Sequence, residues 1–168
     1  RIAGWFARQG VRHLLLLGRR GLHGATDAAV AELRGLGAQV TVAAADVADR
    51  GALQAVLASI PSDLPLRGVV HAAGVIEDGV LTEQTAASMA RVLAPKVGGA
   101  WNLHELTRGH QLDLFVAFSS AAGLLGSVGQ ANYAAANSFL DALAAQHYAN
   151  GNLLMQTSAS NWEDVFID

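Results

Sequence analysis

The chain contains no cysteine, so it can form neither disulfide bonds nor thiolate metal sites. Charged residues are also scarce: they make up 15% of the 168 residues, against about a quarter in an average globular domain. No apolar run approaches the length of about 18 residues that a membrane-spanning helix needs, so we expect no membrane association. The net charge of −3 disfavours a nucleic-acid partner, because nucleic-acid binding normally requires a basic face.

Apolar residues, in contrast, are plentiful: they form 52% of the chain, enough for a substantial core. The length suits one domain, and we interpret residues 1–168 as a single, partial domain. No signal peptide is recognisable, which favours a cytoplasmic location. The chain starts at Arg1 without an initiator methionine, and we interpret it as a piece of a longer polypeptide.

Strand-like and helix-like stretches alternate along the chain. Strands are predicted over residues 13–17, 39–45, 68–71, 112–118 and 153–158. Helices are predicted over residues 2–9, 26–36, 49–60 (with Asp49 as its cap), 82–107 (bent at Pro95) and 132–150. The predicted strands are short and continuously apolar, which is typical of a parallel sheet covered on both faces. Repeated strand–helix units therefore predict an α/β fold with a doubly wound parallel sheet.

Polar or small residues follow four of the predicted strands directly. They are Arg19-Arg20, Asp46-Val47, His71-Ala72-Ala73-Gly74 and Ser119-Ser120. Ligands of open parallel sheets bind beyond the carboxyl ends of the strands. We therefore expect these four strand ends to line one ligand-binding crevice.

Tyr133 and Asn137 lie four positions apart in the predicted helix 132–150, so they share one face. Ser120 precedes Tyr133 across a Gly-rich loop, and Lys96 belongs to the preceding helix. A free tyrosine is a poor acid at neutral pH because its pKa is about 10, but a nearby ammonium stabilises the phenolate. A serine and a tyrosine together can hold a ketone oxygen, stabilise the negative charge that develops on it and protonate it.

Each of these residues also has an ordinary structural interpretation. Taken singly, Tyr133 is expected to pack, Ser120 to cap a strand end, Lys96 to be solvated and Asn137 to be exposed. The combination and its spacing favour catalysis instead.

The residues around these positions resemble the ketoreductase domain of modular type I polyketide synthases, within the short-chain dehydrogenase/reductase superfamily. The matching segments are residues 71–75 (His-Ala-Ala-Gly-Val), 95–97 (Pro-Lys-Val), 118–123 (Phe-Ser-Ser-Ala-Ala-Gly) and 129–137 (Gly-Gln-Ala-Asn-Tyr-Ala-Ala-Ala-Asn). The resemblance extends over about residues 1–150. Most short-chain dehydrogenases carry a lysine four residues after the tyrosine. Here Asn137 holds that place and Lys96 supplies the ammonium, as in polyketide and animal-type fatty-acid synthases.

The resemblance implies a Rossmann-like fold and a role for each residue. Tyr133 is the proton donor, Ser120 binds the carbonyl oxygen, Lys96 acts on the tyrosine and the cofactor ribose, and Asn137 supports them. The implied reaction is the NADPH-dependent reduction of a 3-oxoacyl thioester to a 3-hydroxyacyl thioester. The substrate is carried on the phosphopantetheine of an acyl carrier protein, which is an expected partner beside other domains of the same synthase.

Further residues are expected to bind the cofactor. Arg19 and Arg20 suit the 2′-phosphate of NADPH, where an acidic residue would favour NAD; the ordinary alternative is a solvated loop pair. Asp46 and Val47 resemble a pair that contacts adenine.

Small residues follow the strand 68–71. Ala72, Ala73 and Gly74 let the cofactor approach the backbone. His71 is interpreted as a strand-end residue without a catalytic task, and no metal is expected.

A short segment bears on stereochemistry. Residues 76–78 (Ile-Glu-Asp) resemble the Leu-Asp-Asp motif of B-type ketoreductases, with Asp78 at its last position. The tryptophan of A-type enzymes is absent, and Leu125 lies near its place. The resemblance thus implies a D-configured 3-hydroxyl group. Alternatively, Glu77 and Asp78 merely cap the helix predicted from Thr82.

Two departures from the family pattern stand out. The first strand and the Gly-x-Gly-x-x-Gly phosphate turn are not in the sequence, so we expect residues 1–168 alone to bind NADPH poorly and to be inactive. Residues 151–168 form a divergent tail, in which Glu163 stands where relatives have glycine.

Two other functions stay open. One is a non-catalytic, structural ketoreductase-like subdomain of a synthase; the other is a free-standing dehydrogenase of a small alcohol or sugar. The presence of Ser120, Tyr133 and Asn137 disfavours the first, and the exchange of lysine and asparagine disfavours the second.

Overall fold

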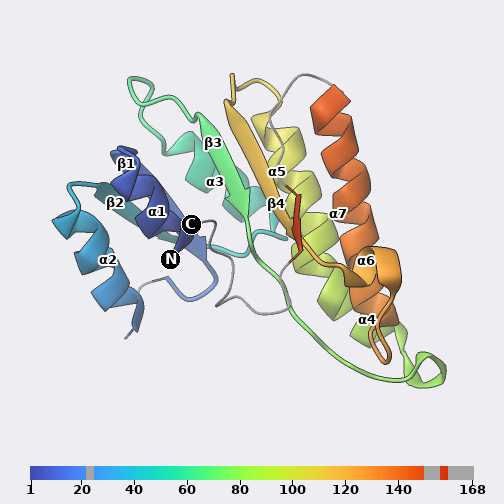
Figure 1. The fold of residues 1–168 in the computed structure, drawn as a ribbon. Coiled ribbons are helices and arrows are strands. Elements are labelled where there is room, and N and C mark those ends of the chain that lie inside the picture. The colour runs from blue at the N-terminus through green and yellow to red at the C-terminus, as the bar shows by residue number, and fades with distance from the viewer. Residues whose placement is uncertain (22–24, 150–155, 159–168) are drawn as a thin grey trace. The chain divides into compact units, whose positions relative to one another are not determined.

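The computed structural model describes residues 1–21, 25–149 and 156–158 (Figure 1). The chain divides into two compact parts, Arg1–Leu64 and Pro65–Asp168. Among the described residues, no helix combines the length and the apolar character that crossing a membrane requires.

The described residues of the first part form two strands and three helices. They are α1 (Ile2–Arg8), β1 (His13–Gly18), α2 (Ala25–Gly35), β2 (Gln39–Ala44) and α3 (Arg50–Ala58). β1 and β2 pair in parallel, with Gly18 opposite Ala44 at their carboxyl ends. Asp49 caps α3 as predicted, because its carboxylate accepts a hydrogen bond of 3.0 Å from the Ala52 N–H.

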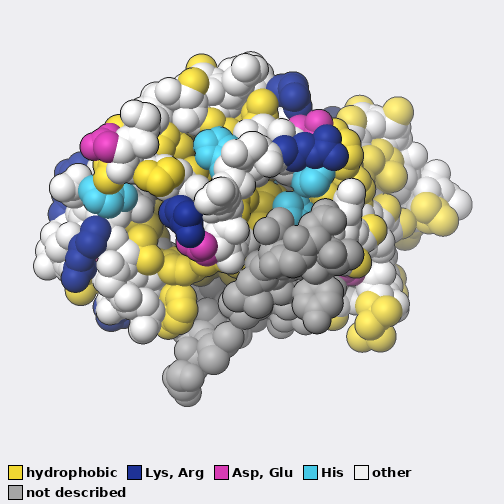
Figure 2. Space-filling model, turned by 90° about the horizontal axis from the view of Figure 1, so that it is seen from above, with side chains coloured by type: hydrophobic (Ala, Val, Ile, Leu, Met, Phe, Trp, Pro, Cys, Tyr) yellow, Lys and Arg dark blue, Asp and Glu magenta, His cyan; other side chains and the backbone are white. Residues whose placement is uncertain are grey.

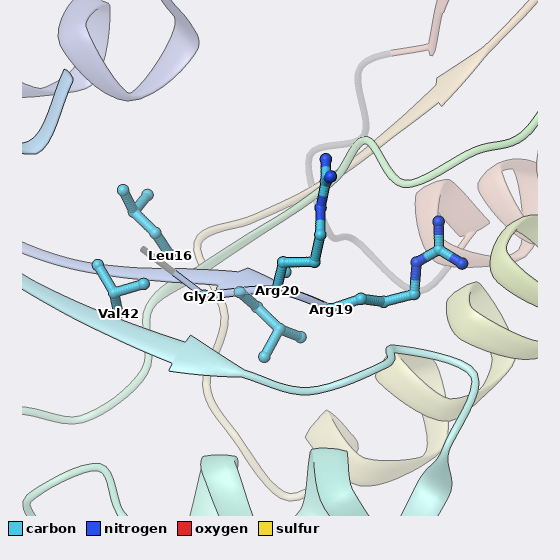
Figure 3. A pocket seen from close by; sticks show the side chains of 7 residues that line it. Leu16, Arg19, Arg20, Gly21 and Val42 are labelled. Atoms are coloured by element: carbon cyan, nitrogen blue, oxygen red, sulfur yellow. The ribbon is translucent and has the colours of Figure 1, made fainter. Parts of the chain in front are cut away.

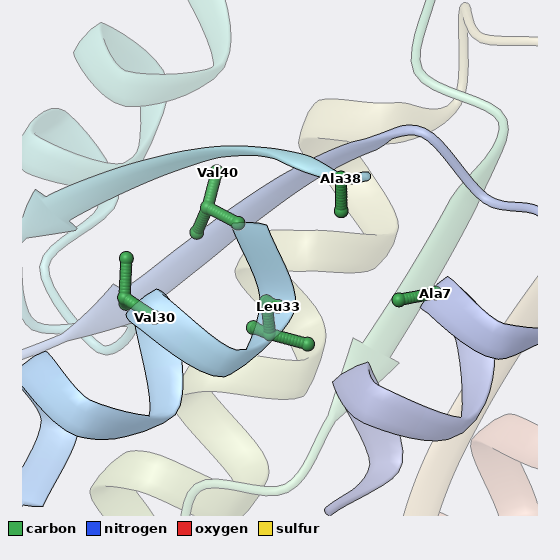
Figure 4. Packing of buried hydrophobic residues seen from close by; sticks show 5 residues of the cluster. All are labelled: Ala7, Val30, Leu33, Ala38 and Val40. Carbon is green, nitrogen blue, oxygen red and sulfur yellow. The ribbon is translucent and has the colours of Figure 1, made fainter. Parts of the chain in front are cut away.

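A small apolar core holds this part together. It joins Ala7 of α1, Val30 and Leu33 of α2, Ala38 before β2 and Val40 of β2 (Figure 4). Val30 and Leu33 are three residues apart, so both face β2 from one side of α2. The apolar residues whose spacing predicts this helix are thus the ones that pack it against β2.

The second part contains a three-stranded parallel sheet and its covering helices. They are β3 (Gly68–His71), the 3₁₀ turn η1 (Leu81–Glu83), α4 (Ala86–Leu93), the π-helical turn η2 (Ala94–Gly98), α5 (Gly99–Thr107), β4 (Leu114–Ser119), α6 (Ala122–Leu125), α7 (Ala131–Ala149) and β5 (Gln156–Ser158). The strand order is β3-β4-β5, and His71 lies opposite Ala117. All strand pairs of the described residues are parallel, which confirms the predicted α/β class.

Two local predictions were wrong. The helix predicted from Thr82 begins only at Ala86, because Thr85 and Ser88 form a reciprocal capping box there: the Thr85 N–H donates to Ser88 Oγ (2.9 Å) and the Ser88 N–H donates to Thr85 Oγ1 (3.1 Å). The short helix α6 lies inside the stretch predicted as a Gly-rich loop. Of the last predicted strand, residues 156–158 are a strand and residues 153–155 lie outside the described residues.

Pro95 changes the helix as predicted, through a π-helical turn. The turn Ala94–Gly98 separates α4 from α5. Proline has no N–H to donate and its ring clashes with the preceding turn, and single π turns accommodate such interruptions inside helices, often at functional sites. Lys96 lies in this turn and its side chain is buried.

We predict that Leu140→Ala lowers the free energy of unfolding by about 2–5 kcal/mol, because the cavity cannot close fully. Leu140 of α7 is 1% exposed and packs with Ala100, Ala117 and Leu143. Leu124→Ala is the matched control: Leu124 is 84% exposed, and we expect a change within about 0.5 kcal/mol. Chemical denaturation measures both, and equal losses would contradict this core assignment.

Candidate active site

Three of the four predicted catalytic residues lie together between β4, η2 and α7. Lys96 Nζ donates to Asn137 Oδ1 and to the Phe118 carbonyl oxygen, both at 2.9 Å. The same nitrogen lies 5.1 Å from the centroid of the Tyr133 ring. Asn137 Nδ2 donates to the Tyr133 carbonyl oxygen at 2.7 Å. Asn137 thus holds the lysine with one end of its amide and the helical turn of Tyr133 with the other.

These side chains are removed from solvent. Lys96 is 1%, Asn137 0% and Tyr133 9% exposed, so the ordinary interpretations of a solvated lysine and an exposed asparagine were wrong. Burial lowers the pKa of Lys96 to about 8, and the charge of Asp141 opposes that decrease. The ammonium therefore changes its charge close to neutral pH.

Ser120 follows β4 directly and is half-buried. Its Oγ accepts a hydrogen bond of 3.2 Å from the Ala122 N–H. The short helix α6 that begins there lies tightly on α7: Ser138 Oγ donates to the Gly123 carbonyl oxygen at 3.0 Å. A Cβ on Gly123 would come within 3.1 Å of the Ser138 nitrogen. The missing side chain of Gly123 thus sets how closely the segment after Ser120 approaches α7.

Asn132 is a buried polar residue that the sequence analysis missed. Its Oδ1 accepts a hydrogen bond of 2.7 Å from the Tyr133 N–H. Its Nδ2 donates to the Glu77 carbonyl oxygen (2.8 Å) and to Gln84 Oε1 (3.1 Å). Asn132 therefore ties the segment 77–84 to the first turn of α7. In the sequence, the position of Asn132 directly before Tyr133 could have indicated this role.

The segment with Asp78 lies against the loop before Tyr133. Gln130 Nε2 donates to Asp78 Oδ1 at 3.0 Å, and the Gly79 N–H donates to the Gly129 carbonyl oxygen at 2.8 Å. Glu77 pairs with Arg91 of α4, and this hydrogen-bonded pair lowers the pKa of Glu77. Neither acid caps a helix, because Thr85 caps α4, so the capping alternative was wrong.

The end of β3 lies beside Lys96. His71 is buried and its pKa falls to about 4, first because of burial and then because of the Lys96 charge. Within the described residues, its Nε2 makes no hydrogen bond. A Cβ on Gly74 would lie 3.2 Å from Lys96 Cε. Gly74 thus leaves room for the lysine stem, while Ala72 is half-buried and Ala73 exposed.

The carboxyl ends of β1 and β2 form a separate feature of the first part. A pocket of about 300 Å³ lies there, lined by Leu16, Leu17, Gly18, Arg19, Arg20, Gly21 and Val42 (Figure 3). Arg19 and Arg20 are exposed, their side chains extend in different directions, and neither forms an ion pair within the part of the chain that is described. These two guanidinium groups line the pocket and have no ion-pair partner among the described residues, so they could bind the phosphate of a ligand.

Asp46 and Val47 follow β2 in the same part. Asp46 Oδ1 accepts a hydrogen bond of 2.9 Å from the Ala48 N–H, and Val47 is buried. The Asp46 carboxylate therefore shapes its own turn. In Figure 2, the lysine and arginine side chains of the described residues lie among apolar and acidic side chains.

A parallel α/β fold in which a helix carries tyrosine and asparagine, with the asparagine bound to a buried lysine, defines a reductase of the short-chain dehydrogenase class. The family model "KR domain" matches residues 1–164. The chain belongs to this family, the ketoreductase domains of polyketide synthases.

Individual relatives agree with this assignment. The chain is 56% identical over 161 residues to mycoketide-CoA synthase of Mycobacterium tuberculosis, and 51% identical over 156 residues to polyketide synthase GfsB of Streptomyces halstedii. These matches cover 95% and 92% of the chain but only 4% and 3% of the two synthases.

Solved ketoreductases have the same fold. An A1-type ketoreductase matches with a TM-score of 0.92 and 42% identity over 99% of the chain and 36% of that structure. A C2-type ketoreductase from a modular polyketide synthase matches with a TM-score of 0.85 and 37% identity, over 97% of the chain and 35% of that structure. Ketoreductases of this superfamily use a nicotinamide cofactor.

We predict that acid destabilises the protein through His71. Its pKa is about 4 in the folded state against 6.5 as the ordinary value, so the unfolded state binds the proton first. The contribution of His71 to the free energy of unfolding is complete above about pH 6.5 and decreases as the pH falls towards 4, by about 2 kcal/mol between pH 7 and pH 5. Denaturation curves at both pH values should show this loss, and in His71→Phe the loss between the two pH values should be smaller by about 2 kcal/mol, while the buried His104 and His147, whose pKa values are also lowered, still contribute theirs. An equal loss in both proteins would refute the role of His71.

Proposed function

We propose that the chain supplies the catalytic residues of an NADPH-dependent ketoreductase. Its substrate is a 3-oxoacyl thioester on the phosphopantetheine of an acyl carrier protein, and its product is the 3-hydroxyacyl thioester. The observation that carries the proposal is the buried Lys96, bound to Asn137 and lying over the ring of Tyr133. Because the chain spans a few per cent of each relative, the carrier protein and the neighbouring synthase domains are part of the proposal.

Tyr133 is the proton donor in this mechanism. NADPH, when bound, would supply the hydride to the carbonyl carbon. Tyr133 and Ser120 donate hydrogen bonds to the carbonyl oxygen, and the Tyr133 proton moves to that oxygen as its negative charge grows. The Lys96 ammonium, near the tyrosine ring, stabilises the phenolate that remains. Asn137 keeps the lysine in place through the 2.9 Å hydrogen bond.

Several residues are proposed to hold the cofactor. Arg19 and Arg20 are assigned to the 2′-phosphate, since they are exposed cations beside the pocket at the end of β1. Asp46 and Val47 are assigned to the adenine. Ala72, Ala73 and Gly74 are assigned to the close approach of the cofactor to the end of β3, and Lys96 to the ribose.

A D-configured hydroxyl product is proposed from residues 76–78. The hydrogen bonds from Gln130 to Asp78 and from Gly79 to Gly129 support it, because they hold this segment against the loop that leads to Tyr133. Solved ketoreductases of both A1 and C2 type share the fold, with TM-scores of 0.92 and 0.85. The stereochemical proposal therefore depends on the local segment and not on the overall fold.

We predict that Tyr133→Phe lowers kcat by about 10²–10⁴-fold, the usual contribution of a positioned proton donor. The assay follows NADPH oxidation with a 3-oxoacyl thioester surrogate in the complete polypeptide that contains this chain. Chiral analysis of the product tests for the D-hydroxyl group. Trp101→Phe is the control, since Trp101 is a partly exposed aromatic residue of α5 and should leave kcat unchanged.

An unchanged rate in Tyr133→Phe would refute its assignment as proton donor. Titration with NADPH distinguishes a reductase from the alternative, a non-catalytic structural subdomain. A structural ketoreductase-like subdomain would produce no change in nicotinamide fluorescence, whereas Tyr133→Phe of an enzyme should still bind the cofactor.

We predict that Arg19→Ala or Arg20→Ala raises the KM for NADPH by about 10–100-fold, because a hydrogen bond to a charged group is worth about 1.5–3 kcal/mol. The KM for NADH should stay the same, since NADH has no 2′-phosphate. Arg12→Ala is the control: Arg12 is an exposed arginine that donates to the Leu36 carbonyl oxygen. Parallel increases of KM for both cofactors would contradict the assignment.

A further inference from the structure

A carboxylate continues the line of Tyr133 and Asn137 on α7. Asp141 follows Asn137 by four residues, as Asn137 follows Tyr133, so all three lie along one face of the helix. Residues 131–149 contain no other acidic residue and no lysine or arginine. A single acid in an otherwise uncharged helix, on the face that carries the site, needs a physical reason.

Asp141 is anchored to the end of β4. Ser119 Oγ donates a hydrogen bond to the carboxylate oxygen Oδ1 of Asp141 at 2.5 Å, and hydrogen bonds to an ionised acceptor are stronger than those between neutral groups. The same hydroxyl lies 3.3 Å from the Asn137 carbonyl oxygen, and the Ser119 side chain is buried. The preceding residue is Phe118, whose carbonyl oxygen accepts from Lys96. Ser119 thus fixes the carboxylate close to the two residues that hold the lysine.

Within the described residues, the direct acceptors of Lys96 are two neutral groups. The Phe118 carbonyl and the Asn137 amide oxygen accept its hydrogen bonds, and neither carries a compensating negative charge. A buried ammonium without a counter-charge tends to lose its proton. Burial does lower the pKa of Lys96, and the charge acting in the other direction is that of Asp141.

The other titratable groups around Lys96 do not replace this charge. His71, at the end of β3, is neutral near pH 7, because burial and the lysine lower its pKa to about 4. On α4, the cation Arg91 is paired with Glu77. On α7, Tyr133 is the group on which the ammonium acts.

We propose that Asp141 is a positioning residue of the ketoreductase, whose carboxylate, anchored by Ser119, is the counter-charge that keeps Lys96 protonated beside Tyr133. This inference rests on the proposed function. Asn137 orients the lysine through a neutral hydrogen bond, and Asp141 maintains its charge. Asp141 touches neither substrate nor cofactor in this role, so its effect on the reaction passes through Lys96.

The test is the pH profile of kcat in the complete polypeptide that contains this chain. The wild type should lose activity as the pH rises through about 8, where Lys96 loses its proton. In Asp141→Asn the ammonium has lost its counter-charge, so the alkaline limb should move to lower pH by about one unit. Asp141→Ser, which also removes the charge, should move it in the same direction. Asp141→Glu keeps the charge and should restore the limb to within a few tenths of a unit.

The matched control is Asp113→Asn, which removes an exposed carboxylate paired with Arg67. It should leave the alkaline limb where it is. If the neutral variants of Asp141 only lowered kcat equally at every pH, the role would be structural and the inference wrong. A variant that no longer changes nicotinamide fluorescence has lost the cofactor site, and the other neutral variant then decides. Failure of the proposed function looks different: the wild type would reduce no thioester and Tyr133→Phe would change nothing.

Discussion

The arrangement of the second part depends on the burial of one ammonium group. Lys96 is almost inaccessible to solvent and donates to a strand carbonyl of β4 and to the Asn137 amide of α7. Removing a cation from water is costly unless its hydrogen bonds are satisfied and a counter-charge lies near. The π-helical turn at Pro95 carries this lysine. The missing side chain of Gly74 leaves room for the lysine stem, and Asn137 of α7 accepts its hydrogen bond.

Hydrogen bonds to the backbone also fix the position of Tyr133, beside which the lysine is buried. Tyr133 is fixed by its own backbone: its N–H donates to Asn132, and its carbonyl accepts from Asn137. Asn132 in turn binds the segment that carries Glu77 and Gln84. The tyrosine and the segment proposed to control stereochemistry are therefore parts of one hydrogen-bonded network.

Local patterns predicted most elements within one or two residues, since apolar spacing and caps act over a few neighbours. The α2 helix follows the spacing of Val30 and Leu33, and Asp49 caps α3. The start of α4 was misplaced because either Thr82 or Thr85 is a possible cap, and the difference depends on the reciprocal bonds of Ser88. The helix α6 was missed because three glycines, Gly123, Gly126 and Gly129, suggested a loop, although Gly123 is required there by the close contact with α7.

Short motifs and the period of apolar residues suffice to predict the α/β class and the family, and they mark Tyr133, Asn137, Ser120 and Lys96 as candidate site residues. The burial of Lys96, its hydrogen bond to Asn137 and its nearness to Asp141, which Ser119 anchors, become visible only in the folded chain. Residues 96, 119 and 141 are far apart in the chain, so their contacts arise only when β4, η2 and α7 pack. Burial and electrostatic environment are properties of that packing and leave no local signal in the sequence.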